Sequence, residues 1–130
     1  MKKLLFILLF SLCAFGEDYV KQGDKQYAIG NFAKAIKFYN KALSLNPKNV
    51  KAYNSRGIVH YELKDYSSAV IDYTQAITMQ PNNLGIIINR GVSYSHLGDY
   101  KNATIDARRA CELGDCELLD MFKMNGTLRD

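Results

Sequence analysis

The chain has 130 residues, of which 48% are hydrophobic, and its formal net charge at pH 7 is +4. This length suits a single domain with a useful core. Lysines and arginines are interspersed with acidic residues and form no basic stripe, so the charge pattern argues against a nucleic-acid-binding protein.

The N-terminus has the pattern of a secretory signal peptide. The basic pair Lys2 and Lys3 precedes an apolar run over residues 4–12, and small residues follow it. A run of this length is too short to span a membrane, which needs about 20 residues. We therefore expect residues 1–16 to be removed before Glu17, which leaves a periplasmic or secreted chain without a membrane span.

Cys13 supports a rival interpretation of the same segment. A lipoprotein signal also ends its apolar run at a cysteine, which then carries lipid. The residue before Cys13 is the bulky Leu12, whereas such signals use a small residue at that position. Lipidation at Cys13 is therefore the less favoured alternative, and the sequence leaves open which signal peptidase processes the chain.

Six segments downstream place apolar residues at helical spacing, and turn residues separate them. No strand-like alternation is sustained anywhere. A shorter amphipathic segment follows Gly114, and an extra helix of this kind covers the exposed end of many stacked folds. We expect three helical hairpins over residues 17–49, 50–83 and 84–117, a capping helix over residues 115–124, and a mobile tail over residues 125–130.

The three hairpins share a period. Gly23, Gly57 and Gly91 are spaced by 34 residues each time. A period in this range, with one helical hairpin per unit, predicts a stacked repeat protein in which each unit buries its apolar face against its neighbours. The same spacing relates Phe32, Tyr66 and Tyr100; Ala35, Ala69 and Ala103; and Ala42, Ala76 and Ala110.

This pattern resembles the tetratricopeptide repeat (TPR), whose signature places an aromatic residue, a Leu-Gly pair and a Tyr in the first helix and an Ala, a Phe and a Pro later. Residues 17–117 resemble three such repeats. The resemblance implies an all-α fold, in which three helix-turn-helix hairpins stack as a right-handed superhelix and a short C-terminal helix closes the stack. The third unit departs from the signature at Ile87, Ala107 and Asp115, so we expect its end to depart from the standard geometry.

The resemblance also implies a concave groove, lined by the first helix of each hairpin, which receives a peptide or an extended segment of another protein. One subset of the family grips a C-terminal carboxylate with lysine, arginine and asparagine. The corresponding residues here are Val20, Asp24, Ser55, Gly85 and Asn89, so we do not expect recognition of chaperone tails. By position, the groove residues are Tyr27, Asn54, Ile58, Tyr61, Ile88, Asn89 and Val92, although tyrosines at helical spacing also serve as packing residues.

Two pairs of opposite charge repeat as well. Arg56 and Arg90 recur with Asp72 and Asp106, each sixteen residues downstream. Ligand contact is one interpretation. Because both members of the pair repeat, structural ion pairs between adjacent helices are the favoured one.

Cys111 and Cys116 remain after the signal peptide is removed. An exported chain meets an oxidising compartment, where an even pair of cysteines suggests a disulfide. The pair resembles the cysteine-paired helix ends of exported Sel1-like repeat proteins, although those cysteines are more widely separated. Two reduced thiols are the alternative, since a bridge needs alpha carbons within about 7 Å.

No converging set of acid, base, nucleophile or metal ligands is visible, so we expect no catalysis, no cofactor and no metal. His96, for example, has no histidine or cysteine at metal-ligand spacing. The sequence favours an exported, periplasmic adaptor or scaffold that binds a protein or peptide, with an envelope protein as the expected partner and no nucleic acid.

Two other functions stay open. One is a lipid-anchored accessory factor for outer-membrane, pilus or cell-wall assembly. The other, which the absence of catalytic residues disfavours, is an enzyme that acts on cell wall or antibiotics. Self-association is also open, because three repeats leave exposed ends that two chains could stack.

Overall fold

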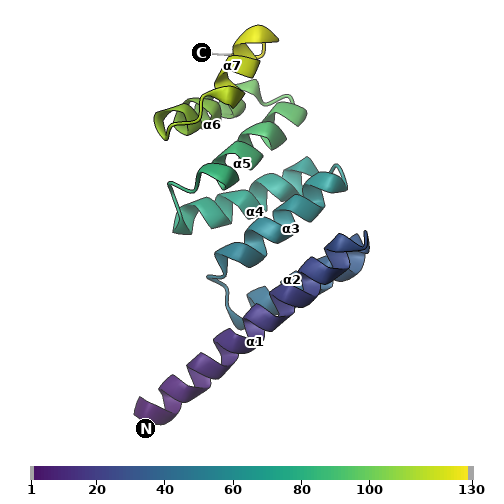
Figure 1. Cartoon of the computed structure of the whole chain (residues 1–130), viewed down its shortest axis with the longest axis vertical. Coiled ribbons are helices and arrows are strands. Elements are labelled where there is room, and N and C mark those ends of the chain that lie inside the picture. Colours follow the sequence, from purple (N-terminus) through teal and green to yellow (C-terminus); the bar gives the residue numbers. More distant parts are fainter. Residues whose placement is uncertain (1, 129–130) are drawn as a thin grey trace.

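The computed structural model describes residues 2–128, and their side chains from residue 14 onward. The described chain is entirely helical, which confirms the all-α expectation. Its helices follow one another along the long axis of the molecule, from α1 at one end to α7 at the other (Figure 1). The seven helices of the described residues are α1 (Lys2–Ala28), α2 (Phe32–Leu45), α3 (Val50–Glu62), α4 (Tyr66–Met79), α5 (Leu84–His96), α6 (Tyr100–Glu112) and α7 (Glu117–Met124).

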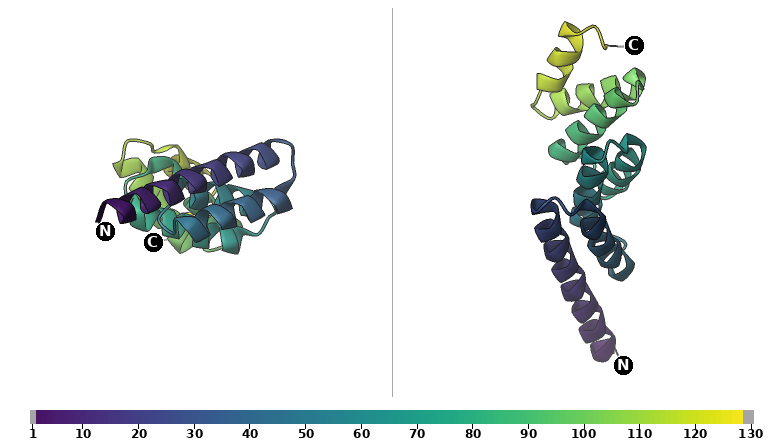
Figure 2. Two further views of the ribbon diagram at one scale, coloured as in Figure 1. Left: turned by 90° about the horizontal axis from the view of Figure 1, so that it is seen from below. Right: turned by 90° about the vertical axis from the view of Figure 1, so that its right-hand side faces the viewer.

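Consecutive helices pair as hairpins. The most extensive contacts are between α1 and α2, α3 and α4, and α5 and α6, and each hairpin then packs on the next. The first helices α1, α3 and α5 lie on one side of the stack and the second helices on the other (Figure 2). This is the stacked-hairpin architecture that the 34-residue period predicts.

The turns inside the hairpins repeat in detail. Gly30, Lys64 and Gly98 occupy the same place in the three turns, and each has a positive φ, between 62° and 75°. Glycine adopts this left-handed conformation without a steric penalty, whereas Lys64 does so at some cost. The next residue then caps the second helix by accepting a backbone N–H with its side chain, and these caps are Asn31, Asp65 and Asp99.

A glycine–tyrosine contact closes the first two hairpins. A Cβ built on Gly57 would lie 2.7 Å from Cε1 of Tyr73, and a Cβ on Gly23 would overlap the Tyr39 ring in the same way. Both tyrosines are 1% exposed. Only glycine lets the first helix approach the ring this closely.

The third hairpin lacks this tyrosine, because Ala107 occupies the equivalent position. The space over Gly91 is filled instead by Leu118 of α7, whose Cδ2 would lie 3.0 Å from a Cβ on that glycine. Leu118 and Phe122 are 6% and 1% exposed and pack with Ala107 in one core cluster. The capping helix therefore replaces the missing aromatic ring. The sequence predicts a departure at the end of this unit but not this form of it.

The C-terminal boundaries differ from those expected. Helix α7 begins at Glu117 and not at residue 115, because Asp115 lies in the turn and its Oδ1 accepts the Glu117 N–H at 3.0 Å. Residues 125–128 are not a free tail. Leu128 packs against the last core cluster and its N–H donates to the Phe122 carbonyl at 3.3 Å. The rest of the expected tail, residues 129–130, lies outside the described residues.

At the N-terminus, α1 runs through the expected cleavage site before Glu17 as one continuous helix. Among the described side chains of α1, Tyr19, Val20 and Tyr27 pack in the first core cluster, and all three follow that site. None of the described helices is both long and apolar enough to cross a membrane. Cys13, where lipidation was the alternative, lies outside the residues whose side chains are described.

Gly57→Ala should be less stable than Gly85→Ala by about 1–3 kcal/mol, because the new methyl group meets the buried Tyr73 ring. At Gly85 the nearest atom to a Cβ is Asn83 Oδ1 at 3.8 Å, so the site is open. Gly57→Ala also gains helix propensity of about 1 kcal/mol, and Gly85→Ala gains less because Gly85 is the second residue of α5, so the measured difference is a lower bound on the cost of the overlap. Urea unfolding followed by circular dichroism measures the difference, and equal stabilities would contradict the close contact.

Leu118→Ala should lower the free energy of unfolding by about 2–5 kcal/mol, because it opens a void over Gly91 that no tyrosine fills. Met124→Ala is the control, since this side chain of the same helix is 89% exposed and should change stability by less than about 0.5 kcal/mol. Amide hydrogen exchange should show faster exchange in α5 and α6 of the Leu118 variant. Exchange that increases in α7 alone would argue against the role of Leu118 in closing the third hairpin.

Candidate functional site

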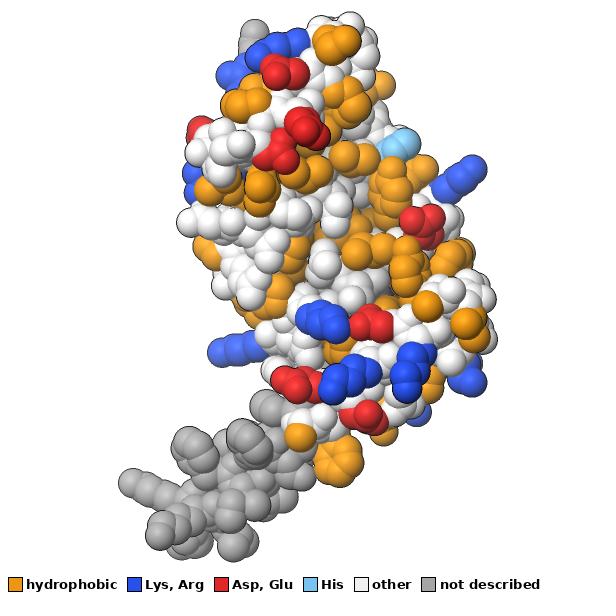
Figure 3. All heavy atoms as spheres, viewed as in Figure 1, with side chains coloured by type: hydrophobic (Ala, Val, Ile, Leu, Met, Phe, Trp, Pro, Cys, Tyr) orange, Lys and Arg blue, Asp and Glu red, His pale blue; other side chains and the backbone are white. Residues whose placement is uncertain are grey.

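The side of the stack that carries α3 and α5 is hollowed at its centre. Figure 3 shows apolar side chains gathered over the middle of this face. Residues three or four apart share one face of a helix, so Ile58, Tyr61 and Glu62 of α3 point together toward Asn89 and Val92 of α5. We call this space, of about 310 Å³, the central hollow; it is lined by Ile58, Tyr61, Glu62, Tyr73, Asn89 and Val92.

An aromatic cluster fixes one edge of the central hollow. The Tyr61 hydroxyl lies 2.9 Å from Nε2 of His96, and the His96 ring stacks on Tyr66 with centroids 4.6 Å apart. The Tyr61 and Tyr66 rings meet edge to face at 5.4 Å. Burial raises the pKa of Tyr61, and the neighbouring Tyr66 and Glu62 raise it further. Tyr61 is thus held as a neutral phenol with a fixed ring, which suits a contact residue.

A second space, the amide hollow, adjoins the central hollow through Asn89. It measures about 300 Å³. The Asn54 Oδ1 atom is buried and accepts no hydrogen bond from the described side chains or backbone. The amide side chains of Asn54 and Asn89 both line this space, and such groups can form hydrogen bonds with a peptide backbone. The lining residues are Val50, Lys51, Asn54, Gln80, Asn83, Gly85, Ile86 and Asn89.

A third space, which we call the N-terminal hollow, lies at the α1 end of the same side. Nearby, Asp24 is engaged twice: Tyr39 donates its hydroxyl proton to Oδ1 at 2.8 Å, and Lys51 Nζ lies 2.9 Å from Oδ2. A C-terminal carboxylate bound beside Asp24 would meet a negative charge. The N-terminal hollow measures about 410 Å³ and is lined by Glu17, Val20, Lys21, Asn46, Asn49 and Lys51.

The predicted groove residues therefore fall into three groups. Ile58, Tyr61, Asn89 and Val92 line the central hollow, and Asn54 lies in the amide hollow with Asn89. Ile88 faces a further hollow beside α7. Tyr27 lines none of the hollows described, because its ring packs against Phe32 with centroids 5.7 Å apart. Ligand binding by all seven residues stays a prediction.

Sequence reasoning missed two contributors to these hollows. Tyr73 forms the floor of the central hollow, and its place in the second helix of its unit put it among the packing residues. The hollow beside α7 was missed altogether, although the amphipathic pattern of the capping helix was visible. Its lining depends on the angle at which α7 returns to α5, which periodicity does not specify.

Arg56 and Arg90 bridge their hairpins. The Arg56 Nε and Nη2 atoms donate to both oxygens of Asp72 at 2.8 and 2.6 Å, and Arg90 binds Asp106 in the same two-pronged way at 2.8 and 2.7 Å. Each carboxylate is nearly buried, and its hydrogen bond raises the pKa of the paired arginine. The third nitrogen of Arg56 donates to Asn40 of the preceding hairpin at 2.6 Å. These arginines therefore join hairpins and do not line the groove.

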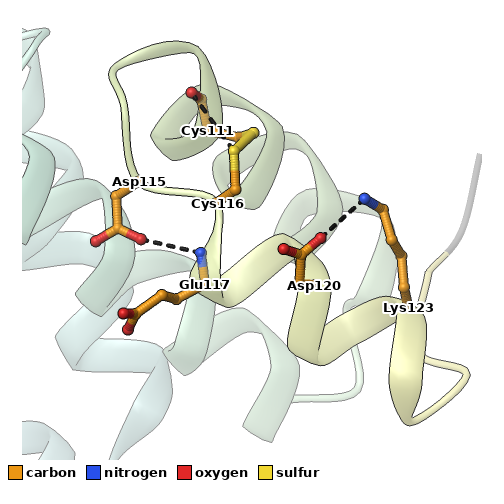
Figure 4. The surroundings of a disulfide bond; sticks show 6 residues. All are labelled: Cys111, Asp115, Cys116, Glu117, Asp120 and Lys123. Carbon is orange, nitrogen blue, oxygen red and sulfur yellow. Dashed lines mark hydrogen bonds and ion pairs between the residues drawn. A yellow bond between two sulfur atoms is a disulfide. The ribbon is translucent and has the colours of Figure 1, made fainter.

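The cysteines meet at the turn between α6 and α7. Their alpha carbons are 4.0 Å apart, within the reach of a disulfide, and the two sulfur atoms face each other (Figure 4). The pair is compatible with a disulfide that ties the end of α6 to the start of α7.

Metal-ligating residue types do not gather into a metal site in the described part of the chain. Among the described side chains, no group of three or more could hold a metal ion. His60 is half-buried between carboxylates, with Nδ1 3.6 Å from Asp65 and Nε2 3.9 Å from Asp72, and so belongs to the framework.

Tyr39 and Tyr73 should resist ionisation in the folded chain. Burial raises the pKa of both phenols, and the hydrogen bond to Asp24 raises that of Tyr39 further. A raised folded pKa means that this contribution to stability is complete below the unfolded pKa of about 10 and is lost as the pH rises above it. Tyrosinate absorbance, recorded with circular dichroism, should show an early change while the helices are intact and a delayed change, from these two phenols, only as helix is lost.

Tyr73→Phe is the control for that titration, because it removes one phenol and keeps the ring. It should reduce the delayed absorbance change while the early change stays the same. A single early step for all nine tyrosines, with the helices intact, would contradict the burial of these hydroxyls.

Comparisons with known proteins agree on the fold. A "TPR repeat" family model matches residues 19–64, and "Tetratricopeptide repeat" models match residues 50–83 and 84–113. The Arabidopsis OM64 TPR domain is 26% identical, with a TM-score of 0.79 over 88% of this chain and 95% of that one. No curated protein matches the chain.

Structures with lower sequence identity show similarity of fold only. The first TPR domain of human RPAP3 is 21% identical, with a TM-score of 0.78 over 88% of this chain and 93% of that one. The TPR2B domain of yeast Sti1, solved in a complex with pHsp70, is 18% identical, with a TM-score of 0.73 over 88% of this chain and 90% of that one. Another structure shows the first TPR of Spaghetti (RPAP3) bound to an HSP90 peptide.

Proposed function

Because this chain belongs to the tetratricopeptide repeat family, we propose that it is a non-catalytic adaptor that binds an extended segment of another protein along α1, α3 and α5. The observation that carries the proposal is the central hollow with the amide hollow beside it. Ile58, Val92 and the fixed Tyr61 ring offer apolar contact area. Asn54 and Asn89 offer amide groups for a peptide backbone.

The proposed ligand is an internal segment and not a C-terminal tail. Recognition of a terminal carboxylate needs positive charge or several donors at its binding point. At the positions that correspond to the family's carboxylate-binding residues, Asp24 is paired with Lys51, and Ser55 and Gly85 carry no charge. We therefore do not propose that this groove binds the chaperone peptides that similar domains bind.

We propose that the chain acts in the periplasm, after export, on an envelope protein. The basic and apolar N-terminal residues support export. Removal of residues 1–16 would keep Tyr19, Val20 and Tyr27, which anchor α1 to the first core cluster. A closed Cys111–Cys116 pair would suit that oxidising compartment.

The groove is tested by a crosslinking pulldown from envelope extract. The double variant Ile58→Ala with Tyr61→Ala should capture at least about tenfold less partner than wild type, because it removes the apolar wall of the central hollow. The control is Ile71→Ala with Ile105→Ala, on exposed positions of α4 and α6. Circular dichroism should show all three proteins folded. Equal capture by the groove variant would refute binding at this site.

Export is tested on the chain purified from its host. N-terminal sequencing and intact mass should show a mature chain that begins at Glu17. A chain that begins at a lipidated Cys13 would favour the anchored accessory factor. An intact Met1 in the cytoplasmic fraction would contradict export.

A further inference from the structure

The groove does not end at the central hollow. A further space of about 380 Å³ lies between α5 and α7, and we call it the terminal hollow. Ile88 lines it and is followed directly by Asn89, which lines the central and amide hollows. An extended segment bound along α5 would therefore pass from one space into the next. The terminal hollow is lined by Ile88, Asp115, Glu117, Leu118 and Met121.

The terminal hollow combines an apolar floor with two carboxylates. Ile88 and the nearly buried Leu118 form the floor, and Met121, 47% exposed, lies beside them. Methionine is flexible and polarisable, so it adapts to varied side chains. Asp115 and Glu117 supply negative charge at the same opening, and none of the described basic residues lines it.

Both carboxylates are available for a partner. Neither forms an ion pair with the described side chains, which are those of residues 14–128. Asp115 uses Oδ1 to accept the Glu117 N–H, which fixes the position of its carboxylate at the start of α7. Figure 4 shows the two side chains projecting to the same side of the turn, away from the cysteine pair. Asp115 lies in the short turn between Cys111 and Cys116, and Glu117 begins α7 directly after Cys116.

Charge differs between the two ends of the groove. The N-terminal hollow is lined by Lys21, by Glu17 and by Lys51, which is paired with Asp24, whereas the described charged residues that line the terminal hollow are both acidic. Figure 3 shows basic and acidic side chains mixed at the lower end of the stack, and acidic side chains beside apolar ones near α7. This difference repels an acidic segment from the α7 end and attracts a basic one.

We infer that the terminal hollow binds a lysine or arginine side chain of the partner's extended segment, with a neighbouring apolar side chain seated against Ile88 and Leu118. The methylene stem of the basic residue packs along Met121 while its charged group meets Asp115 and Glu117. This inference rests on the proposed function, since it assigns a residue preference to one end of the same groove.

The test uses a random dodecapeptide library displayed on phage and selected on the purified chain. Wild type should enrich peptides that carry Lys or Arg within two positions of a bulky apolar residue. The double variant Asp115→Asn with Glu117→Gln should lose the basic preference and keep the apolar one. Asp18→Asn with Glu112→Gln is the matched control, because it removes the same charges from exposed positions outside the hollows and should select like wild type.

Affinity gives a second readout. Fluorescence anisotropy with the peptide that wild type enriches most should show a Kd weakened about three- to tenfold by the Asp115 and Glu117 changes. The control variant should stay within about twofold of wild type. Replacing the basic residue of the peptide by glutamine should weaken binding to wild type but not to the double variant.

Failure of this inference is distinguishable from failure of the proposed function. If wild type selects peptides without a preference for Lys or Arg, or if that preference survives in the double variant, the inference about the terminal hollow is wrong. The Ile58→Ala with Tyr61→Ala variant still tests the groove separately. A wild-type selection that enriches nothing would overturn both. Light scattering that shows a wild-type dimer, dissociated by the Asp115 and Glu117 changes, would make a second copy the occupant and overturn the inference.

Discussion

In the first two hairpins a tyrosine of the second helix rests against a glycine of the first helix. The Gly57 backbone is close enough to Tyr73 that a single added methyl group would overlap the ring, and Gly23 meets Tyr39 in the same way. This contact sets the distance and angle between the two helices. Because each hairpin packs on the next one, the same distance fixes the path of α1, α3 and α5, and with it the shape of the groove.

The third hairpin shows the effect of losing that ring. Ala107 leaves room above Gly91, and Leu118 reaches that room only because α7 folds back onto α5. The capping helix thus does more than cover an exposed end. Its return to α5 also creates the terminal hollow. The alanine at position 107, in place of the tyrosine of the other repeats, is therefore linked both to how the stack is closed and to which residues line the end of the groove.

The groove's polar chemistry depends on which charges the framework uses. Arg56 forms an ion pair with Asp72 and Arg90 with Asp106, and Lys51 is paired with Asp24. The central hollow is lined by Glu62 and otherwise by tyrosine, asparagine and aliphatic side chains. Such a surface selects its ligand by shape, by backbone hydrogen bonds and by the charges at its two ends, which is why a terminal carboxylate has no dedicated partner here.

The sequence by itself determined the architecture. The spacing of Gly23, Gly57 and Gly91 and the residues that repeat with them specify the helical hairpins, because a packed stack requires the same small and large residues at every crossing. It also placed Ile58, Tyr61 and Val92 on one side, since helical periodicity decides which residues share a face.

Only the tertiary structure decided how those faces meet. Tyr73 became the floor of the central hollow, Tyr27 turned toward Phe32, and Asp115 and Glu117 came to lie beside Ile88. Each outcome depends on the distance between helices that are far apart in the chain, and on the angle at which α7 returns. Periodicity carries no information about either quantity, because both are set by side-chain volumes summed across a contact.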